Sequence, residues 1–389
     1  MLSVWRIIIV AFAVVVCESQ QPVLGINVTW RTVTLHDDPY VHEILSTIGE
    51  LGFVATNSMQ VVIPAINVYS NDRMPIMLQF ISDYLYQHPE TVFNCFYTVY
   101  DGWREHTPPA SSKEPSYVLL SQDELQVKYV GHGTIGEPGR FIKRFPEVDN
   151  DVYPAFHYPV IAFSRHKNDP TAILLPDPEF IATRGHVELK QEIDTNDIPW
   201  EQKSNRMVWR GGNNGMAYAR YNVDGPQSVI VDSQGTMTTR LLNQRELLVW
   251  HSQRSPFADS IDAAFASSSA GETSLTKRDM LQYKYQIDVD GEVNAWTGLI
   301  WKMYSGSTVF KVDSHYEQWY YSSLQPWIHY VPIRGDFQDL DEKLAWALAN
   351  DDLARTIADN GRAFVANLTY DGVIATYRIV QDYQLIPIP

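Results

Sequence analysis

The sequence predicts an α/β protein made of two Rossmann-like halves. Short apolar strands alternate with stretches of helical periodicity along most of the 389 residues. Strands that are apolar throughout are typical of parallel sheets covered by helices on both faces. A hydrophobic content of 45% indicates a folded protein with a large core, and the chain is long enough for two domains.

The first half contains two helical patterns and two strands. Apolar residues recur at helical spacing over 41–51, where Gly52 is a fitting stop, and over 76–85. The runs 91–101 and 158–164 are predicted strands, and Asp101 stands at the end of the first. Between them, residues 113–151 are rich in Pro and Gly, which indicates an elaborated loop region.

The second half contains five apolar strands with helical stretches between them. The strands are "RMVW", "SVIV", "YKYQIDV", "STVFK" and "IHYVPI", and the chain is predicted to be helical beyond Leu340. Two α/β halves in succession favour two parallel sheets, one in each half.

The N-terminus is typical of a signal peptide. Arg6 precedes eleven apolar residues, 7–17, a run too short for an ordinary spanning helix, and cleavage is expected after Ser19. A retained membrane anchor is the alternative. Sequons at Asn27 and Asn367 agree with entry into the secretory pathway. Only Cys95 would then remain, so no internal disulfide is expected.

The net charge of −16 makes nucleic acid an unexpected partner, because binding a phosphate backbone needs a basic face. An anionic ligand would need a local cluster of cations and backbone N–H groups. The stretch "VWRGGNNGMAYAR" offers one, with Arg210 and Arg220 around Gly211, Gly212 and Gly215 after an apolar strand. A tight turn with two surface arginines is the competing interpretation.

The stretch "DVDG" allows three interpretations of Asp288 and Asp290. Paired carboxylates hold manganese in some glycosyltransferases, and a glycosidase also needs two carboxylates. The third interpretation is that acidic residues and a glycine simply end a buried strand, and two residues among 46 acids favour it. No His, Cys and carboxylate group elsewhere has the spacing of metal ligands.

Several segments together resemble one known family. "WRGGNN", "YKYQIDVDGEVNAWTG", "YSGSTVFK", "QPWIHYVPI" and "DLDEKLAWALANDDLARTIADNGRAF" are similar to the CAP10-like glycosyltransferases, family 90. That family contains the protein O-glucosyltransferases and capsule xylosyltransferases. The resemblance covers roughly residues 200–383 and is faint before Pro159.

The resemblance implies a GT-B-like fold, with two Rossmann-like domains facing across a cleft. The expected divisions are a signal peptide at 1–19, an acceptor-side domain at 20–200, a donor domain at 201–350 and closing helices at 351–389. The implied activity is an inverting, metal-independent transfer of glucose or xylose from a UDP-sugar to a glycan or protein in the ER or Golgi lumen. UDP-sugar is a co-substrate, and no cofactor is expected.

The resemblance also suggests site residues. The expected donor-binding residues are Arg210, Gly211, Gly212, Arg220, Gly291, Val293, Asn294, Ala295, Trp296, Thr297, Gly298, Leu299 and Lys302. Leu299 stands where relatives are expected to have an arginine that grips the diphosphate, and Lys302 is the expected compensation. The expected catalytic base is Asp101, with Asp149 and Asp151 as rivals. Pro176, Asp177 and Phe180 are acceptor-side candidates.

Two other functions stay open at this stage. The missing arginine favours a catalytically inactive relative that binds glycans or partner proteins. A secreted glycoside hydrolase that uses the "DVDG" carboxylates is the weaker alternative.

Overall fold

The computed structural model describes part of the chain. The described residues are 52–55, 60–62, 73–89, 94–97, 129–130, 142–143, 160–167, 172–213, 227–231, 237–266, 275–291, 293–314 and 316–377. The predicted signal segment, the predicted helix over 41–51, Asn27, Asp101, Asp149, Asp151 and Arg220 lie outside them.

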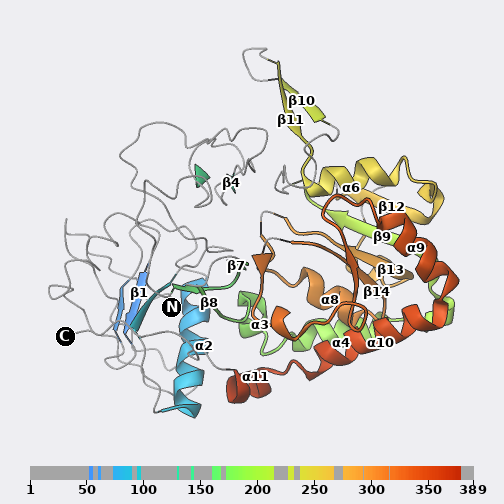
Figure 1. Ribbon diagram of the computed structural model, residues 1–389. Coiled ribbons are helices and arrows are strands. Elements are labelled where there is room, and N and C mark those ends of the chain that lie inside the picture. Colours follow the sequence, from blue (N-terminus) through green and yellow to red (C-terminus); the bar gives the residue numbers. More distant parts are fainter. Residues whose placement is uncertain are drawn as a thin grey trace, which may run out of the picture.

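The second half of the chain forms a five-stranded parallel sheet (Figure 1). Its order is β12 (Ile261–Phe265), β9 (Ser204–Gly211), β13 (Tyr283–Asp288), β14 (Thr308–Val312) and β16 (Val331–Ile333). Every neighbouring pair is parallel, which confirms the predicted parallel sheet. Because all strands run the same way, their carboxyl ends meet at one edge, where open α/β sheets bind ligands.

Helices cover both faces of this sheet. Tyr285 and Ile287 of β13 pack in a core with α6 (Gln244–Ser252) and α9 (Leu340–Ala349). The alternate residues Gln286 and Asp288 hydrogen-bond to α8 (Gly298–Tyr304) or its C-terminal cap. Helices α4 (Val187–Asn196) and α10 (Asp351–Asn367) pack on α8. Because successive side chains of a strand point to opposite faces, these polar residues of β13 face α8 and the two apolar ones face α6 and α9.

The first half forms a second sheet that is mixed and not fully parallel. Its order is β2 (Gln60–Val62), β1 (Gly52–Ala55), β3 (Asn94–Tyr97), β6 (Val160–Ala162) and β8 (Ala172–Leu174). Strands β3, β6 and β8 are parallel, whereas β1 is antiparallel to both of its neighbours. A connection as short as that between β1 and β2 only allows the chain to turn back, since a parallel crossover needs a dozen or more residues. Helices α2 (Arg73–Gln87) and α3 (Pro178–Ala182) accompany this sheet.

Short elements complete the described chain. The predicted strand "SVIV" is β10 (Gln227–Val231), but it pairs with β11 (Met237–Leu241) in a separate antiparallel ribbon beyond α6 (Figure 1). Two small pairs join β4 (Tyr129–Val130) to β5 (Ile142–Lys143) and β7 (Arg165–His166) to β15 (Tyr316–Glu317). The short helices are η2 (Trp200–Gln202), η3 (Ala258–Ser260), α7 (Lys277–Met280), η4 (Tyr321–Ser323) and α11 (Tyr370–Thr376). No helix in the described ranges combines the length and apolar character needed to cross a membrane.

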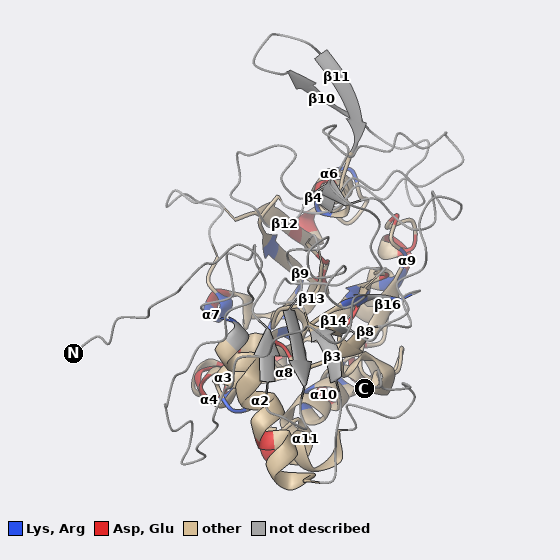
Figure 2. Ribbon diagram, turned by 90° about the vertical axis from the view of Figure 1, so that its left-hand side faces the viewer, with Lys and Arg blue, Asp and Glu red and all other residues tan. Residues whose placement is uncertain are grey.

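One hydrophobic core joins the two halves. It contains residues of α2, β6 and β8 together with residues of α8, β14 and α11. Helix α11 lies beside α2 (Figure 2), where Phe80 meets the ring of Tyr370 edge-on and the Tyr370 hydroxyl donates to Asp83 at 2.8 Å. Helix α11, at the end of the described chain, therefore completes the core around α2.

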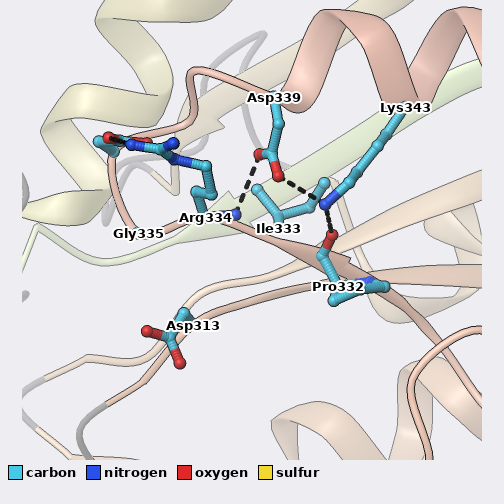
Figure 3. Close-up of a pocket in the computed structure, with 8 residues that line it drawn as sticks. Asp313, Pro332, Ile333, Arg334, Gly335, Asp339 and Lys343 are labelled. Carbon is cyan, nitrogen blue, oxygen red and sulfur yellow. Dashed lines mark hydrogen bonds and ion pairs between the residues drawn. The ribbon is translucent and has the colours of Figure 1, made fainter.

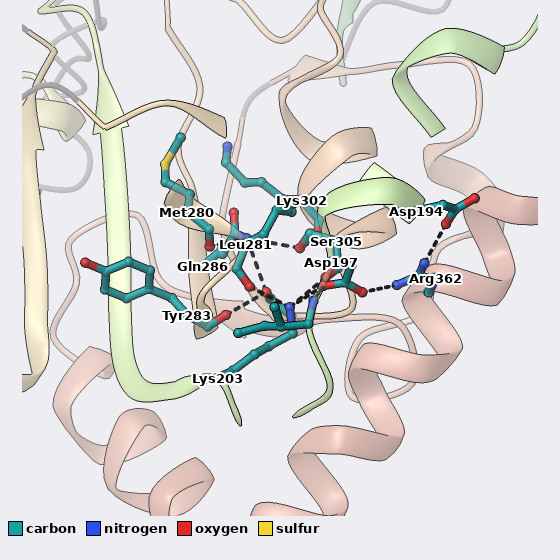
Figure 4. A network of polar contacts seen from close by, with 12 residues as sticks. Asp194, Asp197, Lys203, Met280, Leu281, Tyr283, Gln286, Lys302, Ser305 and Arg362 are labelled. Atoms are coloured by element: carbon teal, nitrogen blue, oxygen red, sulfur yellow. Dashed lines mark hydrogen bonds and ion pairs between the residues drawn. The ribbon is translucent and has the colours of Figure 1, made fainter. Parts of the chain in front are cut away.

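A buried polar network fastens α4, α8 and α10 together (Figure 4). Lys203 is buried, and its ammonium donates to Asp197 at 2.6 Å, to the carbonyl of Leu281 at 2.6 Å and to that of Ser305 at 3.1 Å. Arg362 of α10 also binds Asp197. Because the ammonium uses all three donors, this network fixes the C-terminal end of α8, whose N-terminal end reaches the site described next.

Candidate functional site

A pocket of about 230 Å³ lies at the carboxyl edge of the parallel sheet. It is lined by Trp209, Arg210, Arg245, Asp288, Val289, Asp290, Gly291, Val293, Asn294, Trp296, Gly298, Leu299, Trp301, Lys302, Gln318 and Tyr321. These residues come from β9, β13, α6, α8, the loop after β13 and the segment from β15 to η4. Trp296 is 43% exposed, and the guanidinium of Arg73 from α2 lies 4.9 Å from its ring. The pocket thus adjoins the first half of the chain.

The glycine Gly298 lines the pocket, and another glycine, Gly211, packs against the pocket residue Trp209. A Cβ added to Gly211 would lie 2.6 Å from the ring of Trp209, so a side chain does not fit there. A Cβ on Gly298 would lie 3.6 Å from Asp288 Oδ1 and 3.8 Å from Lys302 Nζ. Glycine at this position leaves those two charged groups accessible from the pocket.

Arg245 is a central pocket residue that the sequence analysis missed. It lies in the first turn of α6, within a capping box in which Asn243 and Glu246 bind each other's backbone N–H. Its guanidinium donates to the carbonyl oxygens of Asp290 at 2.9 Å and Gly212 at 2.9 Å. It therefore bridges the glycine loop after β9 and the loop after β13. The Asn-x-x-Glu pattern was the available signal, because it predicts a helix start at Asn243 and therefore places Arg245 in a first helical turn.

Asp288 and Lys302 form a buried ion pair in the pocket wall. Lys302 Nζ donates to Asp288 Oδ1 at 2.7 Å, and the two side chains are only 10% and 7% exposed. Burial by itself raises the pKa of Asp288, but Lys302 and Lys311 outweigh it and hold the pKa below its ordinary value. Asp288 is therefore ionised, and it fixes the cation that was expected to replace the missing arginine.

The pKa of Asp290 is shifted in the opposite direction to that of Asp288. It lies just beyond the strand end, is buried, and accepts a hydrogen bond from the Ser314 hydroxyl. Burial raises the pKa of Asp290, an effect that nearby Lys311 opposes only in part. The two carboxylates of "DVDG" thus end a strand, as one interpretation had it, but they also form part of the pocket.

The structure brings together most of the predicted donor residues that it describes. Arg210, Gly291, Val293, Asn294, Trp296, Gly298, Leu299 and Lys302 line the pocket, whereas Gly211, Gly212, Ala295 and Thr297 are adjacent to it in sequence. Arg210 is paired with Asp262, Nη2 to Oδ1 at 2.7 Å. Leu299 is 2% exposed and packs in the core that joins the two halves.

The predicted acceptor-side residues are buried. Asp177 caps α3 by accepting from the Phe180 N–H at 2.9 Å, and Pro176 is buried beside it. Phe180 is 0% exposed and packs against Trp319 and Tyr370. Their acceptor role stays a prediction, and contact with an acceptor would require these side chains to become exposed.

A second and larger cavity of about 570 Å³ lies by β16 (Figure 3). Its charged groups are already matched, because Arg334 pairs with Asp336 at 2.6 Å and Lys343 pairs with Asp339 at 2.5 Å. Its lining holds three aspartates and two cations, whereas the first pocket holds three cations and two aspartates, so it offers less to an anionic ligand. Within the described ranges, no three or more His, Cys, Asp or Glu side chains are grouped so that they could hold a metal ion.

A parallel sheet covered by helices, with a glycine-lined pocket at its carboxyl edge, is the Rossmann type of α/β arrangement. The sequence makes this class more specific. The chain belongs to glycosyl transferase family 90, whose family model matches residues 142–384, well over half of its length.

Curated relatives are similar over shorter stretches. Protein O-glucosyltransferase 2 of Danio rerio is 44% identical over 107 residues, 27% of this chain and 21% of the relative. Protein O-glucosyltransferase 3 of Homo sapiens is 39% identical over 107 residues, with the same coverage. Protein O-glucosyltransferase 1 of Rattus norvegicus is 44% identical over 62 residues, 16% of each chain. The match thus spans about a fifth or less of these relatives' lengths.

Proposed function

We propose that this protein is an inverting glycosyltransferase that moves glucose or xylose from a UDP-sugar to a hydroxyl of a glycan or protein in the secretory pathway. The observation that carries the proposal is the pocket of a family 90 chain, which Arg245 and Lys302 line at the carboxyl edge of a parallel sheet. The names of the similar O-glucosyltransferases support a sugar donor of this kind. In this proposal the two α/β halves are the domains of a GT-B fold, divided near residue 200.

The pocket would serve the departing diphosphate. One further negative charge develops on the diphosphate as the glycosidic bond breaks, and fixed cations stabilise it without reorganisation. Lys302 is held by Asp288, and Arg245 is held by two backbone carbonyls, so both cations are in place before the donor arrives. The site would need no metal for this task.

Inversion requires a base opposite the leaving group, and we assign that role to Asp101 with Asp149 and Asp151 as rivals. These residues lie outside the described ones, so the assignment is a proposal from the sequence. We expect Asp101→Asn to lower turnover by about 10²-fold or more, while UDP affinity is unchanged. Steady-state rates and calorimetry with UDP would measure these two effects. Near-full activity of the variant would exclude Asp101 as the base and leave Asp149 and Asp151 as the candidates.

Release of UDP from a panel of UDP-sugars tests the function itself. We expect release with UDP-glucose or UDP-xylose, enhanced by an acceptor, and no release by the variant Lys302→Met at the same concentrations. Absence of release from every donor, despite tight UDP binding, would contradict a transferase.

One observation favours a second function, a catalytically inactive relative that binds glycans or partners. Leu299 gives the pocket an aliphatic side chain where a cation was expected, and its burial in the core leaves no space for one. UDP binding without turnover of any UDP-sugar would support this alternative. A glycoside hydrolase is disfavoured, because Asp288 is bound to Lys302 and Asp290 to Ser314.

A further inference from the structure

Lys311 is a lysine beside the pocket, and its charge acts on Asp288 and Asp290. It lies on β14 directly opposite Asp288 of β13, and residues paired in this way point to the same face of a sheet. That face is the one on which Lys302 binds Asp288. Lys311 is 8% exposed.

Its ammonium differs from those of the other buried lysines. Four lysines are buried among the described residues, and three of them have oxygen partners: Lys203 binds Asp197, Lys284 binds Asp351 and Lys302 binds Asp288. For Lys311, the described residues provide neither a hydrogen bond nor an ion pair. Its Nζ lies 4.6 Å from the centre of the Tyr321 ring, and Tyr321 lines the pocket.

The neighbouring carboxylates do not bind the Lys311 ammonium. Asp288 is bonded to Lys302 and Asp290 to Ser314, and both feel the charge of Lys311 without binding it directly. The other charged group facing these carboxylates is Arg245, which binds the carbonyl of Asp290. The Lys311 ammonium is not among the fully buried polar atoms that lack a partner, so it reaches solvent. Its three N–H groups have no fixed acceptor among the described residues and are free to bind an anionic ligand.

We propose that Lys311 binds the donor, its ammonium leaving the face of the Tyr321 ring for an anionic oxygen of the diphosphate. This inference rests on the proposed function, because it deepens the assignment of the same pocket. A lysine ammonium on a flexible four-carbon stem can make that exchange, and an oxygen anion is a stronger partner than an aromatic face. The Tyr321 hydroxyl is held by Asn294 Nδ2 at 3.2 Å, so the ring can stay in place while the ammonium moves.

Calorimetry with UDP and with uridine tests the proposal. We expect Lys311→Met to weaken UDP binding by about ten- to a hundredfold, the value of a charge-assisted contact, and to leave uridine binding unchanged. Lys311→Arg, which keeps the charge, should retain most of the UDP affinity. Lys284→Met is the matched control, a buried lysine on the adjacent strand away from the pocket, and should bind UDP as wild type does.

Three outcomes would overturn the inference. Equal UDP affinity of Lys311→Met and wild type would remove Lys311 from the donor site while leaving the proposed function intact. A parallel loss of uridine affinity would mean that the substitution distorts the pocket. Failure of wild type to bind UDP would overturn the proposed function and this inference with it. If Lys311→Met does not fold, as judged by thermal melting, Lys311→Gln takes its place.

Discussion

Breaking the ion pair between Asp288 and Lys302 should lower both the stability of the protein and its affinity for UDP. Lys302→Met keeps the length of the side chain and deletes its charge, which leaves a buried carboxylate without its 2.7 Å partner. Breaking a buried pair in this way typically costs 3–5 kcal/mol of stability. Lys311 and Arg245 still act on Asp288, so we expect the lower end, about 3 kcal/mol.

Urea unfolding of four proteins would measure this: wild type, Lys302→Met, Asp288→Asn and the double variant. The double variant removes both charges, and we expect it to recover most of the stability lost in Lys302→Met. Lys284→Met is the comparison, because its partner Asp351 is 47% exposed and can be rehydrated. It should cost only about 1 kcal/mol or less.

The same variant should bind UDP about ten- to a hundredfold more weakly, since a charge-assisted contact to phosphate is lost. The reasoning is refuted if Lys302→Met unfolds within about 0.5 kcal/mol of wild type, the range of an ordinary surface substitution. It is also refuted if the double variant is no more stable than Lys302→Met, because the two charges would then be uncoupled.

Five further predictions concern other features. The pKa of Asp288 is lowered, so Asp288→Asn should destabilise the protein at pH 7 in thermal melts, with a difference that closes as the pH falls through the folded-state pKa. The pKa of Asp290 is raised, so Asp290→Asn should stabilise the protein at pH 7 to 8, and the gain should disappear on acidification towards the ordinary value of 3.8. UDP-sugar turnover should survive excess EDTA, and loss restored by manganese would contradict the donor site described here. Lys203→Met should cost about 3 kcal/mol in urea unfolding, since it leaves partly buried Asp197 with Arg362 as its only cationic partner among the described residues. Asn367 is exposed at the end of α10, so protein from secreting cells should lose mass on glycosidase treatment, and Asn367→Gln should lose less.

The parallel sheet and helices α2, α9 and α10 could be predicted because each depends on local periodicity. The ribbon of β10 and β11 could not, because apolar residues predict a strand but not the strand with which it pairs. Strand β12 was missed, since four of its five residues are only half-buried and its pattern is weak.

The pocket shows the same division. Its two glycine-bearing loops were recognisable from residue type and position. The pairing of Lys302 with Asp288 and the bridging role of Arg245 join residues from separate elements, so they depend on tertiary contacts that spacing does not record. The burial of Phe180 is also a tertiary property, set by Trp319 and Tyr370 from far along the chain.

The core shared by α2 and α11 has a consequence for biosynthesis. Met77, Phe80 and Tyr84 find part of their packing partners in Val373 and Ile374, nearly three hundred residues later. During synthesis, part of the apolar face of α2 therefore stays exposed until almost the whole polypeptide has left the ribosome. The N-terminal half therefore cannot complete its core during synthesis before α11 is available. A chain that stops before α11 is expected to expose this apolar face and to need chaperones.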